Sequence, residues 1–551
     1  MTSEQFADLA SEAIQADCRA NPSAATFLGN HDYDHLLDDP SPAATEAKLV
    51  DARTLLATLD SMNDSGLDDG DRADAAILRN NAARTEFELA ELDEASWNPM
   101  QHNPGHALYS LLSRDFAPLP ERLASLASRL GSVPEYFATA RERLSDLSAV
   151  HTETAISQLE GVIALVEQAI PVAAATIDRA PDLAVGSAAA AHAVRQHQAW
   201  LRDRLAGATH SARVGEQLFG RRLALTLATP WEPKALLDQA YRDLERVEAE
   251  LADVVSAATG RSADHASIAA EFGRLGQDAP SSQTILSYCE SALAETTAFV
   301  ADRDLITLYH DPVEIIEMPE IDRGIAVAYC RSVGALETAP LQTQFAVSPT
   351  PSDWTAQRVT SFYREYNHHM LHNLTVHEAM PGHVEQLSHS RRYAGRTKVR
   401  SVYGSGSIIE GWAVYAEELM VAQGYRSDIS PAAASAVKMQ QLKMQLRMIL
   451  NTILDISFHT GDLDERDAME LMTVRGYQED GEAAGKWRRV QLTSTQLCTY
   501  YVGYLEVRQL AQDLTAAHPD WSARQLHDTM LSLGSPPVGY LRPLLGLPAA
   551  N

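Results

Sequence analysis

One long segment of the chain, Val437–Phe458, is apolar on almost every side when it is placed on a helix. Leu442, Leu446, Ile449 and Ile453 follow one another at helical spacing, and further leucines fill the neighbouring face. A helix that is hydrophobic all round must be enclosed by other elements of a large protein. With 551 residues, the chain is long enough to supply them. This segment therefore predicts a large, mainly helical core.

Other segments of the chain support a mainly α fold. Residues 233–260 begin with Pro233, end at a glycine, and carry apolar residues on one face and charged residues on the other. Ser132–Glu135 resembles a helix start, with Ser132 as the N-cap and Pro134 in the first turn. Residues 407–424 predict one more helix, which ends at Gly424.

A short stretch in the middle of the chain has a different pattern. Val313–Met318, Gly324–Tyr329 and Thr343–Val347 are rich in β-branched and aromatic residues and predict three strands. Helical spacing then returns at Val359 and continues to His377. We therefore expect a small sheet directly before the helix that carries His377. An edge strand at such a place can bind an extended peptide as an additional strand.

Charge and cysteine usage limit the possible partners and the location. The formal net charge of −29 repels phosphate backbones, so nucleic acid and anionic membranes are not expected as partners. The four cysteines form no C-x-x-C pair, which favours free thiols in a reducing compartment. Met1–Asp8 lacks a basic region followed by an apolar run, and no run of 18 apolar residues occurs. These observations predict a cytoplasmic protein.

The segment His377-Glu378-Ala379-Met380-Pro381-Gly382-His383 contains the residue types of a hydrolytic zinc site. Such a site needs two imidazoles and a carboxylate as ligands, together with a second carboxylate that takes a proton from water. In the H-E-x-x-H motif the two histidines are four residues apart and share a helix face. Here they are six apart, and on an unbroken helix they would point roughly 120° away from each other.

The Pro381-Gly382 pair removes this difficulty. The proline ring clashes with the carbonyl four residues earlier, which belongs to His377, and glycine permits backbone angles that other residues avoid. We therefore expect a local break in the helix that turns His383 back toward His377. The sequence also offers a third ligand, Glu410, near the start of the next apolar helix. Glu417 lies two turns further on the same face and is the alternative ligand, although a supporting role suits it better.

The two central motifs resemble a known family. The segment from His377 to His383, followed by Gln386 and then Glu410-Gly411-Trp412-Ala413-Val414-Tyr415-Ala416-Glu417, is similar to the bacterial family called domain of unknown function 885. The similarity runs through most of the chain. That family is grouped with the zinc metallopeptidases whose third ligand is a glutamate. The resemblance implies one zinc ion held by His377, His383 and Glu410, with Glu378 as the general base. It also implies catalytic roles for His459 and Tyr500 and substrate binding by Arg489.

The resemblance also implies an organisation of the whole chain. It predicts a zincin-like fold in which residues 1–551 form one catalytic unit, with a helical N-terminal lobe over 1–300 and a metal-binding lobe over 301–551. Two lobes flanking a cleft are compatible with this fold. The oligomeric state is left open.

The chain departs from the family pattern at three positions. Val384 replaces a histidine, Lys486 replaces an acidic residue three positions before Arg489, and Ser494-Thr495 replaces Pro-Gly. These positions surround the expected substrate rather than the metal.

The leading hypothesis is a zinc-dependent hydrolase that cleaves amide bonds, most simply in peptides. The departures keep open a hydrolase or lyase that acts on a small non-peptide metabolite. A third alternative is a non-catalytic binding protein on a peptidase scaffold, although the presence of Glu378 argues against it. The sequence also leaves open a divalent metal other than zinc.

Overall fold

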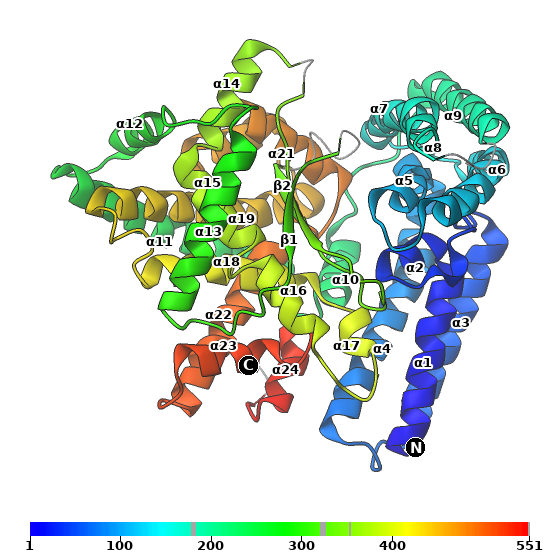
Figure 1. The fold of residues 1–551 in the computed structure, drawn as a ribbon, viewed down its shortest axis with the longest axis horizontal. Helices are drawn as coiled ribbons and strands as arrows, with labels where there is room; N and C mark the ends of the chain where they lie inside the picture. Colours follow the sequence, from blue (N-terminus) through cyan, green and yellow to red (C-terminus); the bar gives the residue numbers. More distant parts are fainter. Residues whose placement is uncertain (178–182, 320–326, 352–353, 549–551) are drawn as a thin grey trace. The chain divides into compact units, whose positions relative to one another are not determined.

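A computed structural model describes residues 1–177, 183–319, 327–351 and 354–548 (Figure 1). The chain divides into two compact units. The first comprises residues 1–212, 333–341 and 396–402, and the second comprises residues 213–332, 342–395 and 403–551. The mainly α fold predicted from the sequence is confirmed, because helices dominate both units.

The first unit is helical throughout its described residues. Its core contains Phe6 and Ile14 of the first helix, which begins with a capping box between Thr2 and Gln5. Two later segments join this unit, and Arg400 and Thr397 both bind the buried carboxylate of Asp74 at 2.7 and 2.6 Å. The α-helices of this unit are α1 (Ser3–Ala20), α2 (Pro22–Leu28), α3 (Pro42–Ser61), α4 (Asp69–Phe87), α5 (Gly105–Ser113), α6 (Leu119–Arg143), α7 (Ala149–Ala164), α8 (Ile170–Ala174), α9 (Ala184–Leu205) and α17 (Val399–Val402). Its short 3-10 and π segments are η1 (His31–Tyr33), η2 (Glu88–Leu92), η3 (Glu94–Ser96), η4 (Pro99–His102) and η5 (Leu165–Ala169).

The predicted helix start at Ser132 is wrong. Helix α6 runs through this position, and Pro134 lies inside it. A proline in a helix interior costs about 3 kcal/mol. Helix α6 nevertheless buries a continuous stripe that includes Leu126, Leu130, Val133 and Phe137, and each buried side chain of this size contributes about 1.5–3 kcal/mol. The burial of this stripe outweighs the cost of the proline.

One helical run of the first unit, Ala149–Ala174, is long and apolar enough to cross a membrane by length and composition. Because a core helix of a soluble protein passes the same test, this is weak evidence. A third of the apolar window is buried inside the structure.

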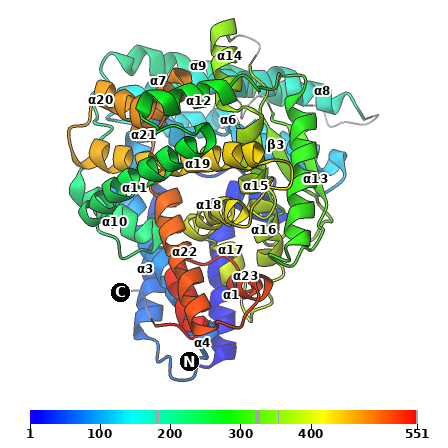
Figure 2. The same cartoon turned by 90° about the vertical axis from the view of Figure 1, so that its left-hand side faces the viewer.

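The second unit combines the remaining helices with the sheet. Its helices are α10 (Glu216–Leu227), α11 (Pro233–Thr259), α12 (His265–Leu275), α13 (Ile285–Asp302), α14 (Ala356–Glu365), α15 (His368–Glu378), α16 (His383–Arg391), α18 (Gly406–Ala422), α19 (Pro431–Thr460), α20 (Glu465–Glu470), η7 (Leu471–Arg475), α21 (Asp480–Leu492), α22 (Thr499–Ala517), α23 (Ala523–Leu531) and α24 (Val538–Leu544). Figure 2 shows α11 lying alongside α19, with α18 and α22 below them.

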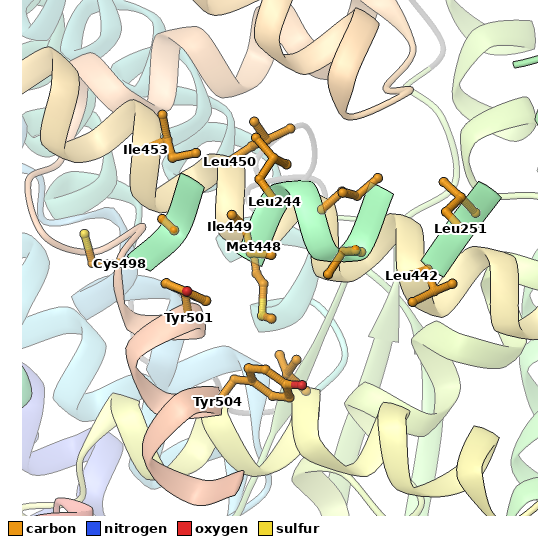
Figure 3. Close-up of a cluster of buried hydrophobic side chains, with 14 of the residues drawn as sticks. Leu244, Leu251, Leu442, Met448, Ile449, Leu450, Ile453, Cys498, Tyr501 and Tyr504 are labelled. Atoms are coloured by element: carbon orange, nitrogen blue, oxygen red, sulfur yellow. The ribbon is translucent and has the colours of Figure 1, made fainter. Parts of the chain in front are cut away.

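The core of the second unit surrounds α19, as the sequence predicted. Apolar side chains of α11, such as Leu244 and Leu251, pack against Leu442 and Ile449 of α19 (Figure 3). Tyr501 of α22 belongs to the same cluster. This packing explains why the boundary between the units falls at residue 213 rather than near residue 300. Helix α11 buries its apolar face against α19 and therefore belongs with the second half of the chain.

The sheet has three strands, β1 (Val313–Glu317), β2 (Ala328–Arg331) and β3 (Thr343–Val347). Strand β3 lies in the middle, parallel to β1 and antiparallel to β2. The bounds of β1 and β3 agree closely with the prediction. The predicted strand 324–329 overlaps β2, and its residues 324–326 lie outside the described residues. Strand β2, at an edge of the sheet, contacts α15, which ends at Glu378.

Candidate metal centre

The helix that carries His377 breaks where the sequence predicted. Helix α15 ends at Glu378 and α16 begins at His383, so the two histidines belong to different helices. The backbone between them forms a tight turn, in which the Gly382 N–H donates to the Val376 carbonyl at 2.9 Å. The indole N–H of Trp412 in α18 donates to the Pro381 carbonyl at 2.7 Å. A side chain distant in sequence therefore fixes the turn.

Glycine is required at position 382 because the turn folds back on the end of α15. A Cβ atom placed on Gly382 would lie 1.9 Å from the His377 carbonyl oxygen and 2.3 Å from that of Val376. Both neighbours are backbone atoms, so neither can move aside without moving the helix. No larger residue fits this turn.

The break brings three potential ligands together. The rings of His377 and His383 lie 4.7 Å apart and nearly perpendicular. Their Nε2 atoms lie 3.4 and 3.5 Å from Oε2 of Glu410. One donor atom from each of these residues lies within 4.8 Å of the other two, and the described residues contain no other such group of His, Cys, Asp or Glu side chains. The donor set of two histidines and one glutamate is one that hydrolytic zinc sites use.

Helix α18 presents Glu410 to the histidines because it crosses α22 very closely. A Cβ atom on Gly411 would lie 2.3 Å from the backbone of Gly503, and one on Gly503 would lie 2.1 Å from the Ser407 carbonyl oxygen. The two glycines thus allow the backbones to touch. Because Glu410 precedes Gly411 and Tyr500 lies one turn before Gly503, the crossing sets the carboxylate and the phenol near each other.

Glu417 orients the His377 ring by binding the nitrogen that faces away from Glu410. Its Oε1 accepts a hydrogen bond from Nδ1 of His377 at 2.7 Å, and its Oε2 accepts one from the Asn373 amide at 2.6 Å. This arrangement directs Nε2 of His377 toward Glu410. Of the two glutamates considered from the sequence, Glu410 is therefore the one that joins the histidines. Asn373, which the sequence analysis missed, lies one turn before His377 and so faces the same way.

Glu378 is buried beside the cluster, with 7% of its surface exposed. Burial raises the pKa of its carboxyl, while His383 and His377 act in the opposite direction. Its carboxylate also accepts a hydrogen bond from the backbone N–H of Cys330 in β2. A carboxylate so placed, close to the two imidazoles, is suited to accept a proton from a water molecule at the cluster.

The charges of the cluster fit a divalent cation. Burial tends to lower the pKa of His377, but the neighbouring carboxylates of Glu410 and Glu417 outweigh it and raise the pKa well above its usual value. Burial tends to raise the pKa of Glu410, but His383 and His377 lower it well below its usual value. The buried carboxylates of Glu378 and Glu417 and the half-buried carboxylate of Glu410 thus surround two imidazoles, and buried charges require compensation. A divalent cation would supply it.

Two buried polar atoms of the cluster also indicate that it binds a cation. Oε2 of Glu410 and Nδ1 of His383 are buried without a hydrogen-bond partner in the part of the chain that the structure describes. Buried polar atoms of this kind are rare and need an explanation. A cation explains the first of them, since Oε2 of Glu410 is the atom that faces both imidazoles.

Two of the other predicted residues lie next to this cluster. The Arg489 guanidinium donates to the Tyr500 hydroxyl at 3.3 Å and to the Gln496 side chain at 2.7 Å. Burial and the charge of Glu410 raise the pKa of Tyr500, while Arg489 lowers it. Tyr500 is therefore a hydrogen-bond donor within the electrostatic range of Glu410.

The structure does not bring His459 to the cluster. This residue lies near the end of α19, where its Nε2 contacts the carbonyl oxygens of Thr493 and Val490 at 2.8 and 3.1 Å. Its Nδ1 accepts from the Val214 N–H at 3.4 Å. Burial lowers the pKa of His459 to about 4. Both ring nitrogens therefore serve the backbone, and the predicted catalytic role is corrected to a structural one.

These features define a class of protein: a mainly α chain with a His-His-Glu cluster built from a broken helix and the helix that crosses α22. The chain belongs to the family described as bacterial protein of unknown function (DUF885), whose model matches residues 22–545. This confirms the family resemblance noted in the sequence. The search of curated proteins found no match.

Two solved structures share the fold. One, a "putative lipoprotein of unknown function" from Shewanella oneidensis, is 27% identical, with 98% of this chain and 99% of that chain covered and a TM-score of 0.83. The other, a "putative lipoprotein" from Colwellia psychrerythraea, is 16% identical, with 98% of each chain covered and a TM-score of 0.80. These descriptions contradict the predicted cytoplasmic location. That prediction was wrong because the composition of a few N-terminal residues is a poor guide to location.

Proposed function

We propose that this protein is a zinc-dependent hydrolase of amide bonds with a zincin-like fold, most simply a metallopeptidase. His377, His383 and Glu410 would hold one zinc ion. The observation that carries the proposal is their mutual approach within 4.8 Å, with Glu378 buried beside them. A site with only a structural role would not need this additional carboxylate.

The residues of the chain divide the chemistry between them. When bound, zinc would lower the pKa of a water molecule and polarise the substrate carbonyl. Glu378 accepts the proton of the attacking water and passes it to the leaving amine. Tyr500 and Arg489 are the neighbouring donors that stabilise negative charge on the carbonyl oxygen. His459 takes no part, since its ring nitrogens bind the backbone.

The position of β2 supports an extended peptide as the substrate. It is an edge strand, and its Cys330 N–H donates to Glu378. A peptide that lay along this strand would pass the general base.

The second candidate is a hydrolase or lyase of a small non-peptide metabolite. The buried Lys486, which by the family resemblance takes the place of an acidic residue, favours this alternative for a small anionic amide.

The decisive variant is Glu378→Gln. We expect the zinc-loaded wild-type protein to cleave members of a peptide library. The variant should lose about 10²- to 10⁴-fold in turnover, because general base catalysis contributes that much. Its zinc content should stay at one ion per chain. Glu418→Gln is the matched control, because Glu418 lies on α18 and binds Tyr504 and Arg508 instead of the histidines. Full turnover by Glu378→Gln would disprove the mechanism. A zinc-loaded wild type that cleaves small amides but no peptide would favour the second candidate, and one that cleaves nothing would indicate a binding protein.

A further inference from the structure

Helix α21 directs three charged side chains to one side. Glu482, Lys486 and Arg489 are spaced by four and three residues, so they share a helix face. Glu482 forms an ion pair with Arg447 of α19 and accepts a hydrogen bond from the Tyr366 hydroxyl at 3.2 Å. The acidic member of this row therefore already has partners.

The second carboxylate of this region is occupied as well. Glu365 binds the Lys443 ammonium at 2.8 Å, and its other oxygen lies 3.9 Å from Arg447. Burial acts to raise the pKa of Glu365, but Lys443 and Arg447 outweigh it, and the pKa is lowered. Glu365 and Glu482 thus balance Lys443 and Arg447, two charges of each sign.

Lys486 and Arg489 remain without a carboxylate. Lys486 is 8% exposed and has no hydrogen bond or ion pair with any described residue. Its charged neighbours are Arg447 and Arg489, and burial together with these two cations lowers its pKa well below the usual value. Arg489 binds only the neutral groups of Gln496 and Tyr500 among the described residues. The ammonium form of Lys486 beside the Arg489 guanidinium is therefore unfavourable without a counter-ion, and a bound anion would stabilise it.

Tyr500 links this pair of side chains to the candidate metal centre. Arg489 donates to Tyr500, and Tyr500 interacts electrostatically with Glu410 and His377. Arg447 also interacts with Tyr500. A substrate bound at the three ligands would thus have Tyr500 beside it, with Arg489 one hydrogen bond further on and Lys486 one turn before Arg489 on α21.

We propose that Lys486 and Arg489 form a binding subsite for a carboxylate of the substrate. The guanidinium can bind a carboxylate in a bidentate manner and the ammonium adds a second charge-assisted bond. This inference rests on the proposed hydrolase function and specifies its substrates as anionic amides. The carboxylate belongs either to the C-terminus of a short peptide or to an acidic side chain next to the cleaved bond.

Turnover of matched substrates tests the subsite in the zinc-loaded, full-length protein. The first pair is one short peptide with a free C-terminal carboxylate or with a C-terminal amide. The second pair is a C-terminally amidated peptide that ends in Glu or in Gln. We expect kcat/KM to be at least tenfold higher for the acid of one pair, and that pair identifies the source of the carboxylate. Equal kcat/KM within both pairs would overturn the proposal.

The variant Lys486→Met removes the charge and keeps a long apolar stem. It should lower kcat/KM for the preferred acid by about 10- to 100-fold, as expected for a hydrogen bond to a charged group. Turnover of the amide should change less than twofold, and so should zinc content. Arg488→Met is the matched control, because Arg488 is an exposed cation on the same helix. An equal loss for the acid and the amide would mean that Lys486 has only a structural role, and would refute the subsite.

Calorimetric titration with succinate and with succinamide separates this proposal from the proposed function. The wild type should bind succinate, Lys486→Met should bind it at least tenfold more weakly, and succinamide should not bind. If no peptide is cleaved but this pattern holds, the hydrolase proposal fails and the anion subsite stands. If peptides are cleaved but neither the titration nor the substrate pairs discriminate, the subsite fails and the hydrolase stands.

Discussion

Substitution of Glu417 by glutamine tests how the candidate metal centre is supported. The side chain is fully buried, and its two oxygens accept hydrogen bonds from Nδ1 of His377 and from the Asn373 amide. Glutamine has one acceptor oxygen, so it can satisfy only one of the two donors and directs its own N–H groups at the other. A hydrogen bond to a charged group contributes about 1.5–3 kcal/mol. Partners that orient ligand histidines typically account for a 10- to 100-fold change in metal affinity.

We therefore expect Glu417→Gln to bind zinc about 10- to 100-fold more weakly than the wild type, measured by competition with a chromophoric chelator. Glu410→Gln should lose more, because it removes the carboxylate charge from a ligand. Glu418→Gln should bind zinc as the wild type does. A Glu417 variant within twofold of the wild type would refute the supporting role. A larger loss for Glu417→Gln than for Glu410→Gln would make Glu417 the ligand instead.

Two further substitutions test the turn beside the cluster, and a third tests a buried carboxyl of α22. Gly382→Ala should lower the midpoint of thermal unfolding and abolish zinc binding, because its Cβ would meet backbone oxygens, while the control Gly273→Ala has no atom within 4 Å and should be neutral or slightly stabilising. Trp412→Phe leaves the buried Pro381 carbonyl without its donor and should cost about 1–3 kcal/mol in denaturant unfolding, with no effect refuting the contact. Burial raises the pKa of Glu506 to about 7, above its unfolded value of about 4.3, so its neutral form stabilises the fold at low pH and this contribution is lost as the pH rises through 7. Glu506→Gln should therefore unfold like the wild type at pH 4 but be more stable at pH 8, and an equal difference at both pH values would contradict this explanation.

The elements with local sequence signals could be predicted closely. Helix α11 begins at Pro233 and is followed by Gly260 in the left-handed conformation, both as expected, because proline suits a first turn and glycine a helix end. The helix break at Pro381-Gly382 was predictable for a similar reason, since it follows from the missing N–H and the ring clash of proline. Pro134 shows the limit of this reasoning. The same local signal gave the wrong result there, because tertiary burial along α6 outweighs it.

The site residues also differ in whether local sequence signals or tertiary contacts determine their roles. Spacing and residue type were enough to propose His377, His383 and Glu410 as ligands, whereas His459 was proposed from the family resemblance alone. Whether a buried histidine faces a metal or the backbone depends on what surrounds it. In this chain the carbonyls of Val490 and Thr493 reach His459 from elements that the sequence does not show to be neighbours. Lys486 is a similar case, because its lack of a counter-ion is visible only once Arg447 and Glu482 are seen to pair with each other.

Helix α18 explains why the two central motifs occur together. Its side chains reach the broken helix at three points: Glu410 meets both imidazoles, Trp412 binds the turn, and Glu417 holds His377 from behind. Seven residues separate the two glutamates, which is about two turns, so both face the same way. Local hydrogen bonds close the turn at Gly382, and α18 supplies the donor for its Pro381 carbonyl. A substitution in residues 377–383 should therefore disturb the position of residues 410–417, and the reverse, because each segment needs the other to place its metal ligands.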